Sequence, residues 1–243
     1  MARGKNIWPI RIGFAVLMSI LACFHAERSF AALCDEPAQF ANDETLTAHG
    51  WTFIEQTEAM RIYNRESSRS RVREVLARAL IDGPPWRAFA AVSDYDRYAD
   101  FMPYVKQSET VRNDGGVRWV FQHLAFFFPI SDRSYTIKLT DVASRPKDQF
   151  YCIEWSLAED GAANRDMPGI VPSVNDGFWI LRPLAGGTKT DVTYFLHSDP
   201  GGWLSAGIID RVNRVALPDV IRAVQKRMTN SDYNRLEPEP RAP

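Results

Sequence analysis

The sequence has no excess of charge of either sign. Its 243 residues include 29 Lys and Arg against 30 Asp and Glu, a formal net charge of −1, and the basic residues are interspersed with acidic ones. A protein that binds nucleic acid through its phosphates needs a basic patch or stripe. We therefore expect no nucleic-acid partner and no general attraction to an anionic membrane surface.

Cysteine and histidine are also scarce, with three and four residues. Their wide spacing forms neither a zinc motif nor a CxxC redox pair. The chain also lacks a GxSxG motif and a glycine-rich phosphate loop. We predict no metal, no cofactor and no catalytic residue. General acid–base chemistry by His123 or His197 remains an open alternative, although no spacing singles them out.

No apolar run reaches the roughly 20 residues that cross a bilayer. Residues 12–24 (IGFAVLMSILACF) are uncharged and mostly apolar, and three basic residues, Arg3, Lys5 and Arg11, precede or flank them. This pattern is typical of a signal peptide. Small residues before position 32 fit cleavage after Ala31. We therefore predict a signal peptide over residues 1–31 and a location in the periplasm or cell envelope.

Two features of the export prediction stay open. Residues 20–23 (ILAC) form an imperfect lipobox, so lipidation of Cys23 is one alternative, and an uncleaved anchor is another. Cys34 and Cys152 would be the only thiols of the mature chain. An exported pair is a candidate for a disulfide bond, but sequence does not show whether the two approach closely enough.

The rest of the chain divides into three parts. Residues 32–50 form a polar leader in which Phe40 and Leu46 could attach a short helix to the body. Residues 51–228 form one domain. Residues 229–243 are polar and proline-rich, and we predict that they are disordered.

The order of elements indicates the fold class. Strands are predicted at 62–65, 71–81, 105–112, 117–127, 135–142, 150–157, 177–183 and 190–197, and helices at 86–93, 94–102 and 203–228. In the last helix, Pro218 marks a phase shift of the apolar stripe, which indicates a break there. We predict an α+β protein: a curved antiparallel sheet wrapped around a long C-terminal helix, with an internal apolar cavity.

Four segments carry a resemblance to a known family. They are 62–65 (IYNR, after Trp51), 129–135 (PISDRSY), 177–184 (GFWILRPL) and 197–204 (HSDPGGWL). In this order and spacing the chain resembles the START (StAR-related lipid transfer) domains of the SRPBCC helix-grip superfamily, of a bacterial exported type. The resemblance implies a lipid cavity between the sheet and the C-terminal helix. It also implies that residues 158–175 and that helix form a gate.

The predicted function follows from this resemblance. We expect the protein to bind a small apolar ligand, a lipid, and to carry or present it in the envelope as a monomer with transient membrane contact. The alternatives are a cyclase/aromatase-like enzyme of the same superfamily and a quinone-binding chaperone. Cholesterol-binding members carry an acid–arginine pair that would fall near His123 and Leu139, and this chain lacks it.

Candidate site residues follow from strand and helix spacing, although a one-residue slip would exchange the two faces of a strand. Arg133 follows Asp132 at a strand entry, where it could hold a lipid head group or brace the sheet by pairing with an acid. The apolar gate residues could touch a membrane. Predicted cavity residues are Trp119, Phe121, His123, Arg133, Tyr135, Ile137, Phe178, Ile180, Tyr194, Leu196, Ile208, Val212 and Val215, and predicted gate residues are Met167, Ile170 and Val171.

Overall fold

The computed structural model describes residues 37–57, 59–126, 130–141, 144–158 and 169–236. The predicted signal peptide with its cleavage site, Cys34 and the gate residue Met167 lie outside the described residues. The predictions made for them therefore stay predictions.

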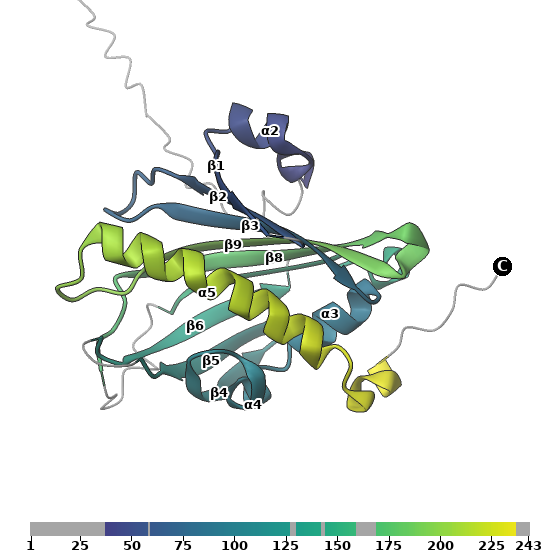
Figure 1. The fold of residues 1–243 in the computed structure, drawn as a ribbon. Coiled ribbons are helices and arrows are strands. Elements are labelled where there is room, and N and C mark those ends of the chain that lie inside the picture. Colours follow the sequence, from purple (N-terminus) through teal and green to yellow (C-terminus); the bar gives the residue numbers. More distant parts are fainter. Residues whose placement is uncertain (1–36, 58, 127–129, 142–143, 159–168, 237–243) are drawn as a thin grey trace, which may run out of the picture.

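Nine antiparallel strands form one curved sheet in the order β1-β2-β3-β9-β8-β7-β6-β5-β4 (Figure 1). The turn between β4 and β5 contains Gly115 and Gly116, both at positive φ, as the Asn-Asp-Gly-Gly hairpin signal requires. The strands are β1 (Thr52–Gln56), β2 (Met60–Arg65), β3 (Glu74–Asp82), β4 (Val105–Asp114), β5 (Val117–Leu124), β6 (Arg133–Asp141), β7 (Tyr151–Leu157), β8 (Val174–Leu184) and β9 (Lys189–Asp199).

Helix α5 (Ala206–Arg227) lies across the concave face of this sheet (Figure 1). Leu217, Ile221 and Val224 recur at helical spacing, are buried and face the sheet. The predicted α+β helix-grip fold is confirmed. The predicted break at Pro218 is wrong, because α5 continues through it. Proline removes one backbone hydrogen bond, and the buried residues on both sides of it hold the helix in place.

Shorter helices close one end of the concave face. They are α3 (Pro85–Val92), η2 (Tyr95–Arg97) and α4 (Tyr98–Phe101). Pro85 stands in the first turn of α3, where its missing N–H costs nothing. Phe89 of α3 stacks on Tyr151 of β7, with ring centroids 4.5 Å apart. Two further 3-10 turns, η3 (Pro146–Asp148) and η4 (Ala185–Gly187), lie in connections.

The convex face of the sheet is covered as well. The leader forms η1 (Pro37–Phe40) and α2 (Asp43–Ala48), and Asn42 and Thr45 cap α2 reciprocally. Phe40 and Leu46 are buried in a second apolar cluster that includes Trp51. The strands at the centre of the sheet are therefore buried on both faces, which explains their weak alternation of polar and apolar residues.

The chain after α5 is ordered further than predicted. Residues Ser231–Leu236 form a 3-10 helix, η5. Tyr233 is buried, and its hydroxyl donates a hydrogen bond of 2.6 Å to Asp94, which also pairs with Arg227. The prediction of disorder is therefore wrong for residues 229–236, because one aromatic side chain anchors them. Residues 237–243 lie outside the described residues.

Within the described part of the chain, no helix combines the length and the apolar character that crossing a membrane requires.

Candidate functional site

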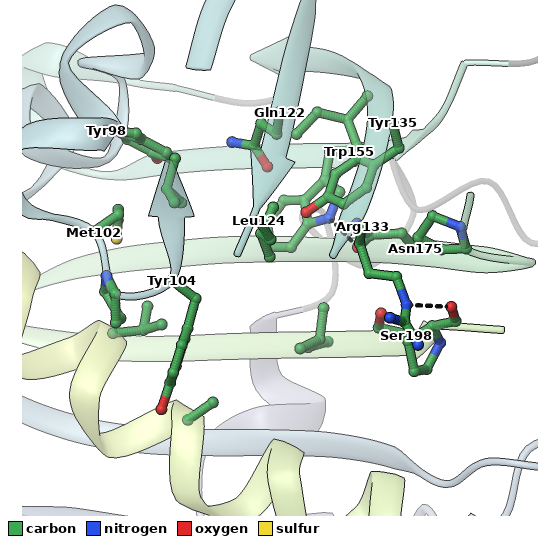
Figure 2. Close-up of a pocket in the computed structure, with 18 of the residues that line it drawn as sticks. Tyr98, Met102, Tyr104, Gln122, Leu124, Arg133, Tyr135, Trp155, Asn175 and Ser198 are labelled. Atoms are coloured by element: carbon green, nitrogen blue, oxygen red, sulfur yellow. Dashed lines mark hydrogen bonds between the residues drawn. The ribbon is translucent and has the colours of Figure 1, made fainter. Parts of the chain in front are cut away.

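A cavity of about 210 Å³ lies between the concave face and α5 (Figure 2). Side chains from the sheet, α5, the helical end of the domain and the loops all contribute to its wall. The lining residues are Val92, Tyr95, Tyr98, Met102, Pro103, Tyr104, Val105, Gln122, Leu124, Phe126, Ile130, Arg133, Tyr135, Ile137, Leu139, Trp155, Pro172, Asn175, Trp179, Tyr194, Leu196, Ser198, Pro200, Leu204, Ile209, Val212, Ala216 and Val220.

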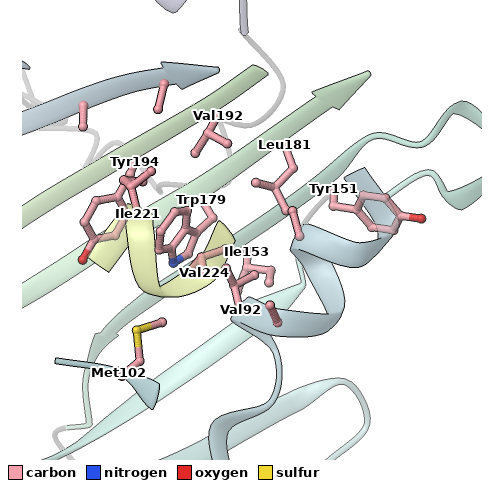
Figure 3. Packing of buried hydrophobic residues seen from close by; sticks show 14 of the residues in the cluster. Val92, Met102, Tyr151, Ile153, Trp179, Leu181, Val192, Tyr194, Ile221 and Val224 are labelled. Atoms are coloured by element: carbon pink, nitrogen blue, oxygen red, sulfur yellow. The ribbon is translucent and has the colours of Figure 1, made fainter. Parts of the chain in front are cut away.

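Three stacked aromatic rings form the floor of the cavity. Tyr194 of β9 lies between Trp179 of β8, at 4.1 Å between ring centroids, and Trp155 of β7, at 5.9 Å. Gly177 makes this packing possible, because a Cβ there would lie 2.0 Å from the Trp155 ring. Trp179 and Tyr194 continue into the apolar cluster that α5 covers (Figure 3).

Five tyrosine side chains are among the described residues that line the cavity. Burial raises the pKa of Tyr98, Tyr135 and Tyr194 far above the ordinary value for a phenol. All three therefore stay neutral and can both donate and accept hydrogen bonds at any physiological pH. Tyr98 donates to the backbone carbonyl oxygen of Val92.

Amide side chains lie next to these rings. The Oδ1 of Asn175 accepts a hydrogen bond of 3.4 Å from the indole nitrogen of Trp155. Asn175 pairs in register with Ser198 on β9, so two polar side chains face the cavity from neighbouring strands. They provide directed hydrogen-bonding groups in an otherwise apolar wall.

Arg133 is the only charged residue that lines the cavity among the described residues. It is 3 % exposed, and burial lowers its pKa. Its Nε donates to the carbonyl oxygen of Pro200 at 2.7 Å, Nη1 donates to that of Ser131, and Nη2 lies 3.4 Å from that of Gly201. Arg133 thus ties the start of β6 to the turn before α5. Two roles were predicted for Arg133: holding a lipid head group, or bracing the sheet by pairing with an acid. Arg133 does brace the sheet, but its described partners are backbone carbonyl groups and not an acid.

Six of the predicted site residues lie on the cavity wall. They share the concave face of β6 and β9 or the buried face of α5. They are Arg133, Tyr135, Ile137, Tyr194, Leu196 and Val212. That any of them binds a ligand stays a prediction.

The other predicted lining residues lie elsewhere. On β5 the even-numbered residues Gln122 and Leu124 face the cavity, so Trp119, Phe121 and His123 face away, and Trp119 packs under the guanidinium of Arg112 at 4.1 Å. The placement was wrong by one residue, because both faces of the strand carry large side chains.

The predicted cavity-facing residues of β8 and α5 were also displaced by one position. Phe178 and Ile180 belong to the convex-face cluster, and Trp179 takes the cavity position between them. On α5, Ile208 and Val215 are 42 % and 57 % exposed, whereas Ile209 and Ala216 line the cavity. At these two positions the residues of α5 that face the cavity therefore lie one residue after the predicted ones.

Sequence reasoning missed the residues at the helical end of the cavity. The helical spacing of Tyr98 and Met102 in the predicted helix 94–102 is typical of core residues, but both line the cavity wall at the edge of the core. Tyr104 adopts positive φ, which no sequence pattern indicated, and its ring stacks on Phe126 with centroids 5.5 Å apart. Helical spacing alone does not distinguish residues that line a cavity from residues that pack in a core.

The described part of the predicted gate lies beside Arg133. Ile170 forms a parallel bridge with Arg133, and its backbone N–H donates a hydrogen bond to the backbone carbonyl oxygen of Asp132. Val171 is 48 % exposed, and the next residue, Pro172, lines the cavity. These contacts place the end of the predicted gate loop at the cavity wall, whereas its opening stays a prediction.

Cys152 is buried in the convex-face cluster and is disulfide-bonded. Its predicted partner, Cys34, lies outside the described residues, so the pairing stays a prediction.

A Ser–His pair lies on the opposite face of the sheet from the cavity. Ser70 Oγ is 2.8 Å from Nε2 of the buried His197, and Arg69 Nη2 is 3.0 Å from its Nδ1. A guanidinium can only donate, so Nδ1 accepts and the ring proton lies on Nε2. A nucleophilic serine needs an accepting Nε2. The pair therefore ties the loop before β3 to β9 and is not arranged for nucleophilic catalysis.

His123, the other candidate base, pairs with Asp132 at 2.9 Å on the same convex side. Among the described residues there is no group of three side chains able to hold a metal ion.

A family described as polyketide cyclase / dehydrase and lipid transport matches residues 81–225, more than half of the chain. The chain belongs to this family. No curated protein matches it.

Solved structures share the fold of this member of the polyketide cyclase / dehydrase and lipid transport family. A STAR-related lipid transfer protein from Xanthomonas axonopodis is 19% identical, with a TM-score of 0.65 over 74% of this chain and 99% of that one. Human STARD10 is 12% identical, with a TM-score of 0.67 over 80% and 82%. Human StAR-related lipid transfer protein 5 is 14% identical, with a TM-score of 0.63 over 82% and 98%. The predicted START-like fold is confirmed.

Proposed function

We propose that this protein binds a small apolar ligand, a lipid, in the cavity under α5 and carries or presents it in the cell envelope. The observation that carries the proposal is the composition of the wall. The described lining residues include no His, Asp, Glu, Cys or Lys, whereas apolar and aromatic side chains dominate. Such a wall suits burial of hydrocarbon, at about 0.8 kcal/mol for each CH₂ group, and lacks a base for acid–base catalysis.

The size of the cavity limits what it takes in this conformation. An apolar cavity of about 150 Å³ is enough to bind benzene. At about 210 Å³ the present cavity is large enough for a ring or one short chain. A diacyl lipid would require α5 or the neighbouring loops to move outward. We propose that the gate predicted at residues 158–175 opens for this, and the support is that Pro172, at its described end, lines the cavity.

Exposed apolar residues near the start of α5 support transient membrane contact. Trp203 is 68 % exposed and Ile208 is 42 % exposed, and Val171 of the predicted gate is also exposed. Arg211 adds an exposed positive charge on α5. Exposed apolar side chains with a flanking cation suit insertion at the interface of a bilayer.

The direct test is native mass spectrometry of the full chain, expressed in a bacterial host and purified without detergent from the periplasmic fraction. The proposal expects export and a protein peak with the added mass of a lipid, which solvent extraction then identifies. Protein that is retained in the cytoplasm contradicts the envelope role. Exported protein without any bound apolar molecule, and without uptake from vesicles, contradicts the ligand-binding role.

A further inference from the structure

Three polar side chains of the cavity wall lie together at one end. Asn175 and Ser198 are register partners on β8 and β9, and Arg133 lies at the start of β6 on the same concave face. Figure 2 shows these three on one side of the cavity, with Met102 and Tyr98 on the other. A ligand that fits this wall has one polar end and one apolar end.

No described acid forms an ion pair with Arg133, although the charge of Asp132 acts on it through space. No described carboxylate lies within 4.0 Å of its guanidinium, and its hydrogen-bond partners are neutral carbonyl groups. The nearest acid along the chain, Asp132, is engaged elsewhere, because its two carboxylate oxygens accept from His123 at 2.9 Å and from the backbone N–H of Phe126 at 3.2 Å. Burial of a charge without a counter-ion is costly.

The guanidinium also keeps free donors. Each of its terminal nitrogens carries two N–H groups. Nη1 uses one of them for Ser131 and Nη2 directs one to Gly201. One N–H on each terminal nitrogen therefore remains, and two such donors match the two oxygens of a carboxylate or a phosphate.

We propose that the ligand carries an anionic head group, a carboxylate or a phosphate, which binds Arg133 beside Asn175 and Ser198. Its apolar part extends toward Met102 and the aromatic floor. This inference rests on the proposed function, since it names the class of ligand that the same cavity takes.

Four ten-carbon probes test the inference on the full-length protein. They are decanoate, decyl phosphate, decanol and decyltrimethylammonium, which share a chain and differ in the head group. Trp155 and Trp179 line the cavity and report binding through their fluorescence. We expect both anions to bind about tenfold to a hundredfold more tightly than decanol, as hydrogen bonds to a charged group predict. The cation should bind more weakly than decanol.

Arg133→Gln should reduce the preference for the anions over decanol to about twofold or less, without weakening decanol. Arg211→Gln removes the same charge from the exposed side of α5 and should leave the preference unchanged. Arg133 also supports the turn before α5, so Arg133→Gln could fail to fold. In that case the four probes on the unsubstituted protein still decide whether the cavity prefers an anionic head group.

The outcomes separate the two proposals. Equal binding of decanol and the anions overturns the anionic head group and leaves the apolar cavity intact. An anion preference that survives in folded Arg133→Gln overturns the role of Arg133. Failure of all four probes to bind overturns the proposed function itself.

Discussion

The ring of Tyr104, in the segment before β4, stacks on the ring of Phe126, in the segment after β5, with ring centroids 5.5 Å apart. Tyr104 also forms part of the cavity wall. The pKa of its phenol is raised, first by burial and then by the carboxylate of Asp219 on α5. One residue thus joins two segments at the edge of the sheet and lies near the helix that covers the cavity.

Removing this link should speed ligand exchange. Tyr104→Ala deletes the ring stack with Phe126, so we expect ligand to leave about tenfold faster, measured by stopped-flow tryptophan fluorescence with decanol. Tyr104→Phe keeps the ring and should give a smaller increase. If neither variant changes the release rate, Tyr104 does not control access to the cavity.

Filling the cavity should abolish binding. Ala216 lines the cavity on α5, so Ala216→Trp places a large ring where the ligand lies. Val215, the adjacent residue, is 57 % exposed and provides the control Val215→Trp. We expect the first variant to lose bound lipid in native mass spectra while keeping its circular dichroism spectrum, and the second to retain it. Equal lipid content in both would argue that the ligand lies elsewhere.

The two faces of β8 should respond differently to truncation. Phe178 is 1 % exposed in the convex-face cluster, so Phe178→Ala should lower the free energy of unfolding by about 3–5 kcal/mol in urea titrations. Ligand selectivity should not change. Trp179→Ala instead enlarges the cavity and should shift the preference toward larger ligands. A change in selectivity with Phe178→Ala would contradict the register of β8.

This difference also shows where prediction from sequence succeeded. The order of strands and helices, the turn at Gly115 and Gly116, and the long final helix followed from turn residues and periodicity. The faces of β6 and β9 were also placed correctly, because Arg133 and Tyr194 fall in alternating patterns.

The error on β8 has a physical cause. Phe178, Trp179 and Ile180 are all buried, because the leader covers the convex face, so hydropathy does not tell one face of β8 from the other. Trp119 on β5 was misplaced because a large aromatic side chain is buried on the convex face too, under the guanidinium of Arg112. The polar end of the cavity was only partly predicted: Asn175 follows from no motif and became recognisable only through its register with Ser198.

His197 should make stability depend on pH. Its pKa is lowered by burial and by Arg69, against opposing effects of Glu74, Asp176 and Asp199. The unfolded chain, with an imidazole pKa of about 6.5, therefore binds more protons than the native state. The free energy of unfolding should fall as the pH drops below about 6.5. His197→Asn should flatten this part of the curve, and an unchanged slope would refute the assignment.

Glu154 should act with the opposite sign. Burial raises its pKa from 4.5 to about 7, and its Oε2 has no hydrogen-bond partner among the described residues. The native state then binds more protons than the unfolded chain between these values, so this group lowers stability as the pH rises from about 4.5 to 7. Glu154→Gln should raise the free energy of unfolding at pH 8 by about 1 kcal/mol and change little at pH 4. Exposed Glu109 provides the control, Glu109→Gln, and an equal effect of both would contradict the role of burial.

The layer that Phe40, Leu46 and Trp51 add behind the sheet has a mechanical consequence. A sheet packed on its convex face resists bending outward, because such bending would separate aromatic contacts. One of these contacts joins Phe40 and Phe178, with ring centroids 5.3 Å apart. Any extra room for a bulkier guest must then come from the front, where α5 bears on the concave face. The largest molecule that this protein can hold is therefore set by how far α5 and the loops beside it can lift.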